Sequence, residues 1–142
     1  MLINIPPLLG PDFLHVLRSM GHGDEIALVD ANYPAAAHGR RVVRCDGLGL
    51  IEVARAVLTV MPVDEDVAHA IFRPASGRDP QRLEAMHGAI DGLCAAMVPD
   101  RPVTGLAGNA FYDRVRAAYA VVATSEPALY ANMIIRKGVI RP

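Results

Sequence analysis

The fold is decided by residues 21–34, which read Gly-His-Gly-Asp-Glu-Ile-Ala-Leu-Val-Asp-Ala-Asn-Tyr-Pro. Two glycines flank His22, and glycine lets a tight turn adopt positive φ without a Cβ penalty. The four apolar residues 26–29 are too few for a helix and are typical of a buried strand. Asp30 stands where this strand ends, and ligands of open α/β sheets gather at the carboxyl ends of strands. The stretch therefore predicts a turn, a buried strand and a functional carboxylate.

His22 precedes the predicted strand and Asp30 follows it. An extended strand of this length separates two such side chains by roughly 20 Å or more. The two residues can serve one site only if the turn folds back, or if the site is shared with another subunit.

Along the rest of the chain, segments with the hydrophobic spacing of a helix alternate with short apolar runs typical of strands. Helical spacing predicts helices over residues 11–20, 48–58, 81–97 and 110–117, the last capped by Asn109. Short apolar runs predict strands over residues 26–29, 41–45, 67–72, 119–124 and 132–136. Residues 98–104 contain two prolines and can form an edge strand at most, whereas residues 31–40 and 105–109 are expected to be loop and turn. The expected fold class is α/β: a single domain with a mostly parallel central sheet and helices on both faces.

The composition limits the class of function. The chain has 142 residues, enough for one domain with a substantial core, and 52% of them are hydrophobic, which excludes a disordered chain. Lys and Arg number 14 against 15 Asp and Glu, so there is no basic surface charge for nucleic acid or an anionic membrane. We expect no signal peptide and no membrane-spanning run, and Cys45 and Cys94 are expected to be free thiols of a cytoplasmic protein. The high apolar content favours self-association into a homo-oligomer.

Standard catalytic motifs for nucleotides, phosphates and nucleophilic serine do not occur. The histidines are scattered along the sequence and do not form a ligand spacing for a metal. The expected structural roles of the others are a solvated or interface residue for His15, a surface loop for His38, a sheet position for His69 and the edge of a buried helix face for His87. What remains is His22, a residue type suited to proton transfer, with carboxylates at Asp24 and Asp30. This inventory fits proton transfer without a cofactor or a metal.

A set of short stretches occurs in order along the chain. They are Gly-His-Gly-Asp-Glu-Ile at 21–26, Asp-Ala-Asn-Tyr-Pro at 30–34, Arg-Cys-Asp-Gly at 44–47, Ala-Phe-Tyr-Asp-Arg at 110–114, Tyr-Ala-Asn-Met-Ile-Ile at 130–135 and Lys-Gly-Val at 137–139. Together they resemble the D-ribose pyranase / L-fucose mutarotase family over nearly the whole chain, and the fucose branch more closely than the ribose branch. Residues 1–142 are thereby expected to form one sugar mutarotase-like domain.

The resemblance implies an isomerase that interconverts the anomers or ring forms of a monosaccharide such as L-fucose or D-ribose. It implies that His22 acts as general acid on the ring oxygen. It implies that the sugar is held by Asp30, Tyr112, Tyr130, Ala131 and Asn132. No cofactor is implied, and the site is expected between subunits of a ring-like homo-oligomer, for which a decamer is one arrangement.

One position departs from the family pattern. The fucose branch has an arginine just before the Phe-Ala-Phe-Tyr helix and the ribose branch a histidine, whereas this chain has Gly108. Because glycine supplies no side-chain donor, the alternative function is a non-catalytic sugar-binding or transport-accessory protein. A third and weaker alternative is an oligomeric metal-binding protein.

Overall fold

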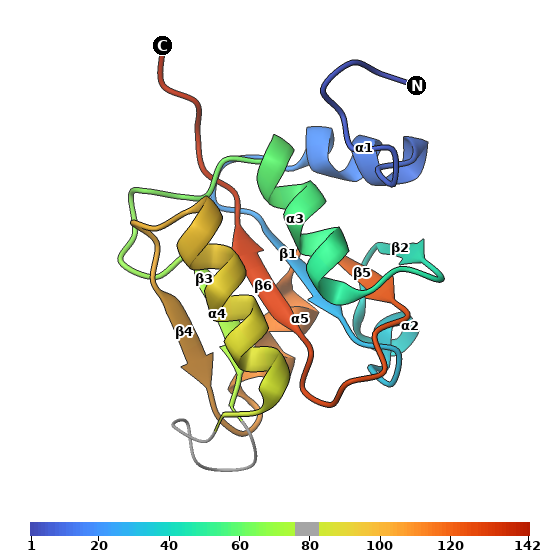
Figure 1. The fold of residues 1–142 in the computed structure, drawn as a ribbon, viewed down its shortest axis with the longest axis vertical. Helices are drawn as coiled ribbons and strands as arrows, with labels where there is room; N and C mark the ends of the chain where they lie inside the picture. The colour runs from blue at the N-terminus through green and yellow to red at the C-terminus, as the bar shows by residue number, and fades with distance from the viewer. Residues whose placement is uncertain (76–82) are drawn as a thin grey trace.

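The computed structural model describes residues 1–75 and 83–142 and contains one six-stranded sheet in the order β2-β5-β1-β6-β3-β4 (Figure 1). The strands are β1 (Glu25–Val29), β2 (Val42–Cys45), β3 (Ile71–Pro74), β4 (Val103–Leu106), β5 (Ala120–Thr124) and β6 (Met133–Arg136). β6 runs antiparallel to β1 and β3, while the pairs β1–β5, β2–β5 and β3–β4 are parallel. The predicted mostly parallel sheet is confirmed.

Helices cover both faces of the sheet, as predicted (Figure 1). α1 (Pro11–Ser19), α3 (Leu50–Val60) and α4 (Ala85–Met97) pack on one face, and α2 (Ala35–His38) and α5 (Ala110–Ala117) pack on the other. None of the helices in residues 1–75 and 83–142 combines the length and the apolar character needed to cross a bilayer.

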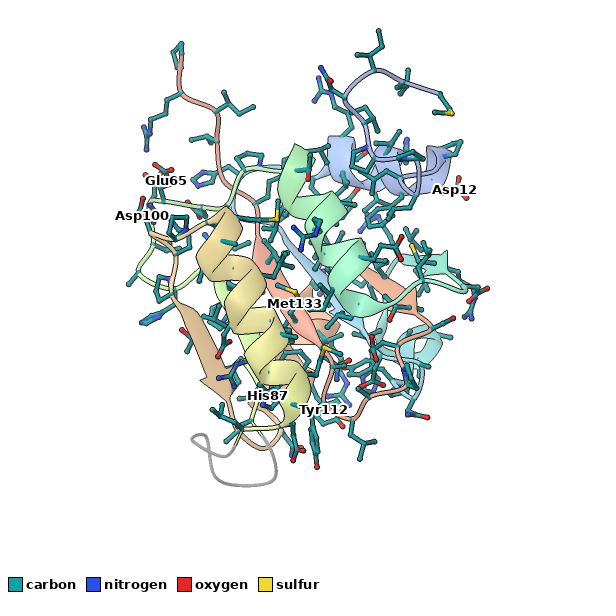
Figure 2. All side chains as sticks on the ribbon, in the orientation of Figure 1. Asp12, Glu65, His87, Asp100, Tyr112 and Met133 are labelled. Carbon is teal, nitrogen blue, oxygen red and sulfur yellow. The ribbon has the colours of Figure 1, made fainter. Side chains whose placement is uncertain are left out.

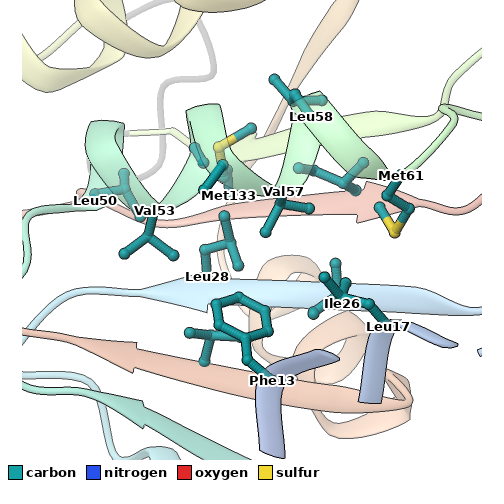
Figure 3. Packing of buried hydrophobic residues seen from close by; sticks show 14 of the residues in the cluster. Phe13, Leu17, Ile26, Leu28, Leu50, Val53, Val57, Leu58, Met61 and Met133 are labelled. Carbon is teal, nitrogen blue, oxygen red and sulfur yellow. The ribbon is translucent and has the colours of Figure 1, made fainter. Parts of the chain in front are cut away.

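β1 lies at the centre of the core because its apolar side chains pack on both faces of the sheet. Ile26 and Leu28 pack toward α1 and α3, where Phe13 and Val53 contact the same cluster (Figure 3). The alternate residues 27 and 29 pack toward α5, and all four side chains of 26–29 are fully buried. A strand buried on both faces is uniformly apolar, which is why this run could be recognised from the sequence.

Several element boundaries differ from the prediction. β3 begins at Ile71, so residues 67–70 are not strand, because β6 pairs only with Ile71 and Phe72. His69 is therefore exposed outside the sheet, where its Nδ1 lies 2.9 Å from the Thr104 hydroxyl. Residues 105 and 106 were expected in a turn but extend β4, which is the predicted edge strand. The expected loop 31–40 contains the short helix α2.

Two of the predicted helices begin later than expected. α3 starts at Leu50, two residues on, and α4 starts at Ala85, while residues 81 and 82 of the predicted helix lie outside the described residues. His87 is fully buried instead of lying at the edge of the apolar face, because its Nδ1 accepts the Glu84 N–H in a capping box. Asn109 precedes α5 as expected but makes no side-chain cap hydrogen bond.

The antiparallel pairing of β1 with β6 creates two distinct sheet edges. Glu25 at the start of β1 lies opposite Arg136 at the end of β6, so the other ends of these strands meet at the far edge. The two basic residues at 136–137 are not a solvated end of the last strand. Lys137 Nζ donates to the carbonyl oxygens of Leu17 and Met20 at 2.7 and 2.6 Å, which satisfies the last turn of α1.

The segment after β6 packs directly on the chain that carries Asp64. A Cβ at Gly138 would lie 2.6 Å from the Val63 carbonyl oxygen and 2.8 Å from the Asp64 Cα. We expect Gly138→Ala to lower the free energy of unfolding by about 1–3 kcal/mol, because the backbone must move to accommodate the methyl group. Chemical denaturation measures the change. The matched control is Gly92→Ala on α4, which meets nothing within 4 Å and is expected to gain about 0.5–1 kcal/mol; equal effects of the two substitutions would contradict the prediction.

Candidate functional site

The functional side chains form two groups at opposite edges of the sheet. We call His22, Asp64, Asp66 and Arg136 the His22 cluster, which lies where β1 begins and β6 ends. We call Asp30, Tyr33, Tyr112, Tyr130 and Asn132 the Asp30 cluster, which lies where β1 ends and β6 begins. In Figure 2, Tyr112 marks the edge with the Asp30 cluster, and Glu65, next to Asp64, marks the opposite edge.

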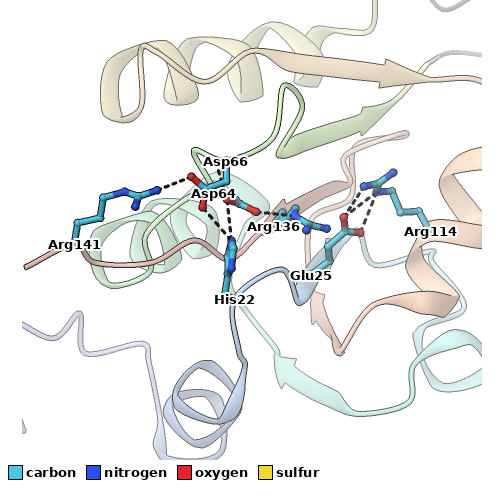
Figure 4. A network of polar contacts seen from close by, with 7 residues as sticks. All are labelled: His22, Glu25, Asp64, Asp66, Arg114, Arg136 and Arg141. Carbon is cyan, nitrogen blue, oxygen red and sulfur yellow. Dashed lines mark hydrogen bonds and ion pairs between the residues drawn. The ribbon is translucent and has the colours of Figure 1, made fainter.

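The turn before β1 presents His22 to solvent. The Asp24 carboxylate accepts the Gly21 N–H at 2.8 Å, and Gly23 adopts a φ of 86°, which glycine tolerates. Asp24 therefore stabilises the turn. The His22 side chain is 43% exposed, and its Nε2 lies 3.1 Å from Asp64 Oδ1 (Figure 4). Because a carboxylate only accepts hydrogen bonds, Nε2 carries the hydrogen, and Nδ1 has no hydrogen-bond partner among residues 1–75 and 83–142.

Asp64 is a buried anion beneath His22. Its side chain is 1% exposed, and Arg136 Nε donates to Asp64 Oδ2 at 2.8 Å. Burial raises the pKa of Asp64, but hydrogen bonds from Arg136, from the Asp66 N–H and from His22 together outweigh burial and lower the pKa to about 2. Asp64 therefore stays ionised at neutral pH and can stabilise a protonated His22.

The same cluster contains the donor types of a metal site. Ligand atoms of His22, Asp64 and Asp66 lie within 4.8 Å of one another. Both carboxylates are already paired with guanidinium groups, Asp64 with Arg136 and Asp66 with Arg141 at 2.5 Å (Figure 4). These arginines compensate the negative charge that a cation would otherwise balance, so the arrangement fits an ion-pair network better than a metal centre.

Glu25 is the first residue of β1, and its carboxylate accepts hydrogen bonds from Arg114 of α5, the shortest at 2.6 Å (Figure 4). The pair ties α5 to the start of β1 and so fixes the helix that carries Tyr112.

Asp30 and Asn132 join the end of β1 to the start of β6. Asn132 Nδ2 donates to Asp30 Oδ2 at 2.9 Å, and the Asp30 N–H donates to Asn132 Oδ1 at 2.8 Å. The Asn32 N–H donates to Asp30 Oδ1 at 2.9 Å. Burial raises the pKa of Asp30. The hydrogen bonds that its carboxylate accepts from Asn32 and Asn132 lower the pKa, but burial is the larger effect. The carboxylate is therefore held in one orientation at the mouth of a cavity.

Two adjoining cavities, of about 260 and 190 Å³, open beside this carboxylate. Both are lined by Tyr33, Tyr112, Tyr130 and Asn132, and Asp30 lines the smaller one. Tyr130 adopts a φ of 57°, a left-handed conformation that is uncommon for a bulky residue and is found preferentially at functional sites. Apolar ring faces with a few fixed polar groups are typical of small-molecule sites.

The structure brings together most but not all of the predicted site residues. Asp30, Tyr112, Tyr130 and Asn132 line one site, whereas the Ala131 side chain is fully buried in the core. His22 lies at the other end of β1, separated from Asp30 by roughly 20 Å of strand. The turn does not fold back, so His22 and Asp30 of one chain do not form a single site.

Two residues, one in the His22 cluster and one in contact with the Asp30 cluster, could not be assigned from the sequence. Asp64 lies 42 positions from His22, and its only local signal is an acidic residue directly after an apolar run that contains a proline. His38 was expected to be a surface loop residue, but it is the last residue of α2 and its Nδ1 lies 2.9 Å from the Tyr33 hydroxyl. A histidine five positions after a tyrosine gives no recognisable pattern by itself.

Gly108 lines the larger cavity with a φ of 59°, and a Cβ at this position would meet nothing within 4 Å. Of the described residues that line this cavity, none is cationic. The absence of a side-chain donor at Gly108 is thus not compensated by an arginine or a lysine in the described lining.

Comparison with known proteins places these features in context. The model of the RbsD / FucU transport protein family matches residues 3–140. Fucose mutarotase from Bos taurus is 37% identical over 148 aligned positions, which cover 100% of this chain and 96% of the relative. The crystal structure of fucose mutarotase in complex with L-fucose from Streptococcus pneumoniae is 40% identical, with a TM-score of 0.82 and coverage of 99% and 100% of the two chains. Bacillus subtilis RbsD, complexed with D-ribose, is 22% identical with a TM-score of 0.76 over 94% and 95% of the chains, which shows a likeness of fold.

Proposed function

The chain belongs to the RbsD / FucU transport protein family, and from this premise we propose that it is a monosaccharide mutarotase. In this proposal it is an isomerase that interconverts the anomers or ring forms of a sugar such as L-fucose. The observation that carries the proposal is the Asp30–Asn132 pair, fixed by reciprocal hydrogen bonds beside cavities lined by three tyrosines. Fucose mutarotases that align over the full chain support it. The cytoplasmic location stays a prediction.

The reaction requires proton transfer at two oxygens of the sugar. An acid protonates the ring oxygen as the bond from the anomeric carbon to that oxygen breaks, and the anomeric hydroxyl loses its proton to a base as the carbonyl forms. Ring closure on the other face reverses both transfers. A protonated His22 can donate from Nδ1, while the Asp64 carboxylate holds Nε2–H and stabilises the imidazolium. The Asp30 carboxylate accepts hydrogen bonds from sugar hydroxyls.

The active site in this proposal is built from two subunits. His22 and Asp30 lie at opposite ends of β1, so the His22 edge of one subunit must meet the Asp30 edge of a neighbour in a homo-oligomer. Exposed apolar residues surround the Asp30 cavities: Leu129 is 66% exposed and Tyr112 42%. Such residues are typical of an interaction surface. A ring of subunits, such as a decamer, would complete every site in the same way.

Saturation-transfer NMR on L-fucose and D-ribose tests the proposal. We expect anomer exchange to rise in proportion to protein concentration, since a positioned acid or base contributes about 10²–10⁴-fold. Exchange that stays at the uncatalysed rate at high protein concentration would exclude mutarotase activity on these sugars. Calorimetric binding of a sugar without exchange would instead identify a non-catalytic sugar-binding protein.

A further inference from the structure

A chain of polar contacts adjoins the Asp30 cavities on the side of α2 and α5. The Tyr33 hydroxyl lies 2.9 Å from His38 Nδ1, and Arg116 Nη2 lies 3.1 Å from His38 Nε2. Tyr33 lines both cavities, whereas His38 and Arg116 do not line them. The contacts therefore connect an exposed cation to a tyrosine in the cavity wall through one imidazole.

The chemistry of these groups fixes the direction of each hydrogen bond. A guanidinium group has donors and no acceptor, so Arg116 donates to His38 Nε2. In a neutral imidazole the other nitrogen then carries the hydrogen, so Nδ1–H donates to the Tyr33 hydroxyl oxygen. Within the described part of the chain the hydrogen of the Tyr33 hydroxyl is left without an acceptor, so it is available to a molecule in the cavity.

The position of Tyr33 is also restrained. Its ring stacks on Tyr112 with centroids 5.6 Å apart and planes at 21°, and it meets the His38 ring edge-on at 5.4 Å. Burial, followed by the neighbouring Tyr112, raises the pKa of Tyr33 to about 12, so its hydroxyl keeps its hydrogen at any working pH. Restrained aromatic donors bind with little loss of conformational entropy.

We propose that Tyr33 is a sugar-binding residue that donates a hydrogen bond to a hydroxyl oxygen of the monosaccharide, and that His38 and Arg116 are positioning residues that set this donor. This assignment rests on the proposed function and deepens it. The Tyr33 hydroxyl provides a neutral donor in a cavity where Gly108 has no side chain and where no described lining residue is cationic. The donor selects for sugars that carry a hydroxyl group at the position it faces.

The first test measures L-fucose binding by calorimetry and exchange by NMR in wild type and Tyr33→Phe. We expect the Kd to rise about two- to tenfold with kcat little changed, since one neutral hydrogen bond made equally in ground and transition states is lost while the ring stays in place. The matched control is Tyr119→Phe, whose half-buried ring packs under Arg41 at the start of β5, away from these cavities. Wild-type exchange combined with an unchanged Kd in Tyr33→Phe overturns the assignment alone. Failure of the wild type to bind or exchange any sugar overturns the proposed function together with it.

The second test separates positioning from mere packing. If His38 acts through the Tyr33 hydroxyl, His38→Ala raises the Kd in the wild-type background but leaves it unchanged in the Tyr33→Phe background. Additive effects of the two substitutions contradict the assignment. The ¹⁵N spectrum of His38 at about pH 8, above the ordinary imidazole pKa, should show hydrogen on Nδ1 and none on Nε2. The opposite tautomer overturns the proposal without reference to any sugar.

Discussion

Replacing His22 with alanine is expected to lower the rate of sugar anomer exchange by about 10²–10⁴-fold, the contribution of one positioned acid or base. His22 is the only histidine in the described residues that combines an exposed ring with a buried carboxylate partner. The fold should survive, because the side chain is 43% exposed and Asp64 keeps its hydrogen bonds from Arg136 and from the Asp66 N–H. Saturation-transfer NMR measures exchange, and circular dichroism with size-exclusion chromatography checks the fold and assembly.

The matched control is His15→Ala, because His15 is also exposed but lies on α1, away from Asp64. It should exchange sugar at the wild-type rate. Wild-type exchange in His22→Ala would remove His22 from the role of general acid.

A mixing experiment tests where His22 acts. His22→Ala and Asp30→Asn are each expected to be inactive, but unfolding and refolding them together should restore part of the exchange, because some interfaces then join an intact His22 to an intact Asp30. Absence of any recovery, with mixed oligomers demonstrated, would show that the two residues do not complete one another across an interface.

Lowering the pH from 5 to 2 is expected to reduce the free energy of unfolding of the wild type by about 2 kcal/mol more than that of an Asp64→Asn variant. The native pKa of Asp64 is about 2 against an ordinary value of 3.8, and each unit of difference corresponds to about 1.4 kcal/mol. Because the native pKa is lowered, the stabilisation is fully present above pH 3.8 and is lost as the pH falls toward 2. Asparagine does not titrate, so the variant lacks this loss.

Chemical denaturation at a series of pH values measures the difference. At neutral pH, Asp64→Asn should be the less stable protein by about 2 kcal/mol, since the charged hydrogen bond from Arg136 is weakened, and the difference should close near pH 2. The control is Asp12→Asn, at an exposed position in the first turn of α1. Its free energy of unfolding should fall between pH 5 and pH 2 by the same amount as that of the wild type. A constant gap between wild type and Asp64→Asn across this range would contradict the role assigned to Asp64. The variant should also slow exchange, because it no longer holds Nε2–H of His22 with a charge.

The site residues found from the sequence are those with a local signal or a family pattern. Asp30 directly follows the buried strand β1 and was expected at the end of that strand, whereas Asn132 was assigned to the site by the family resemblance and directly precedes β6. The pairing between them spans 102 positions and depends on β6 running antiparallel to β1. Asp64 and His38 were not assigned to the site, because neither lies near its partner in a regular sequence pattern.

The amino-acid sequence was enough to predict the α/β class, the buried strand β1 and the distance that this strand places between its two ends. These follow from local physics, because an apolar run buried on both faces needs no alternation and an extended chain has a fixed rise per residue. Three features appear only in the folded chain: the direction of β6, the burial of Asp64 beneath His22 and the contacts from Arg116 through His38 to Tyr33. Each of these depends on side chains that are distant along the chain, whose proximity is set by how the sheet and helices pack and not by neighbouring residues.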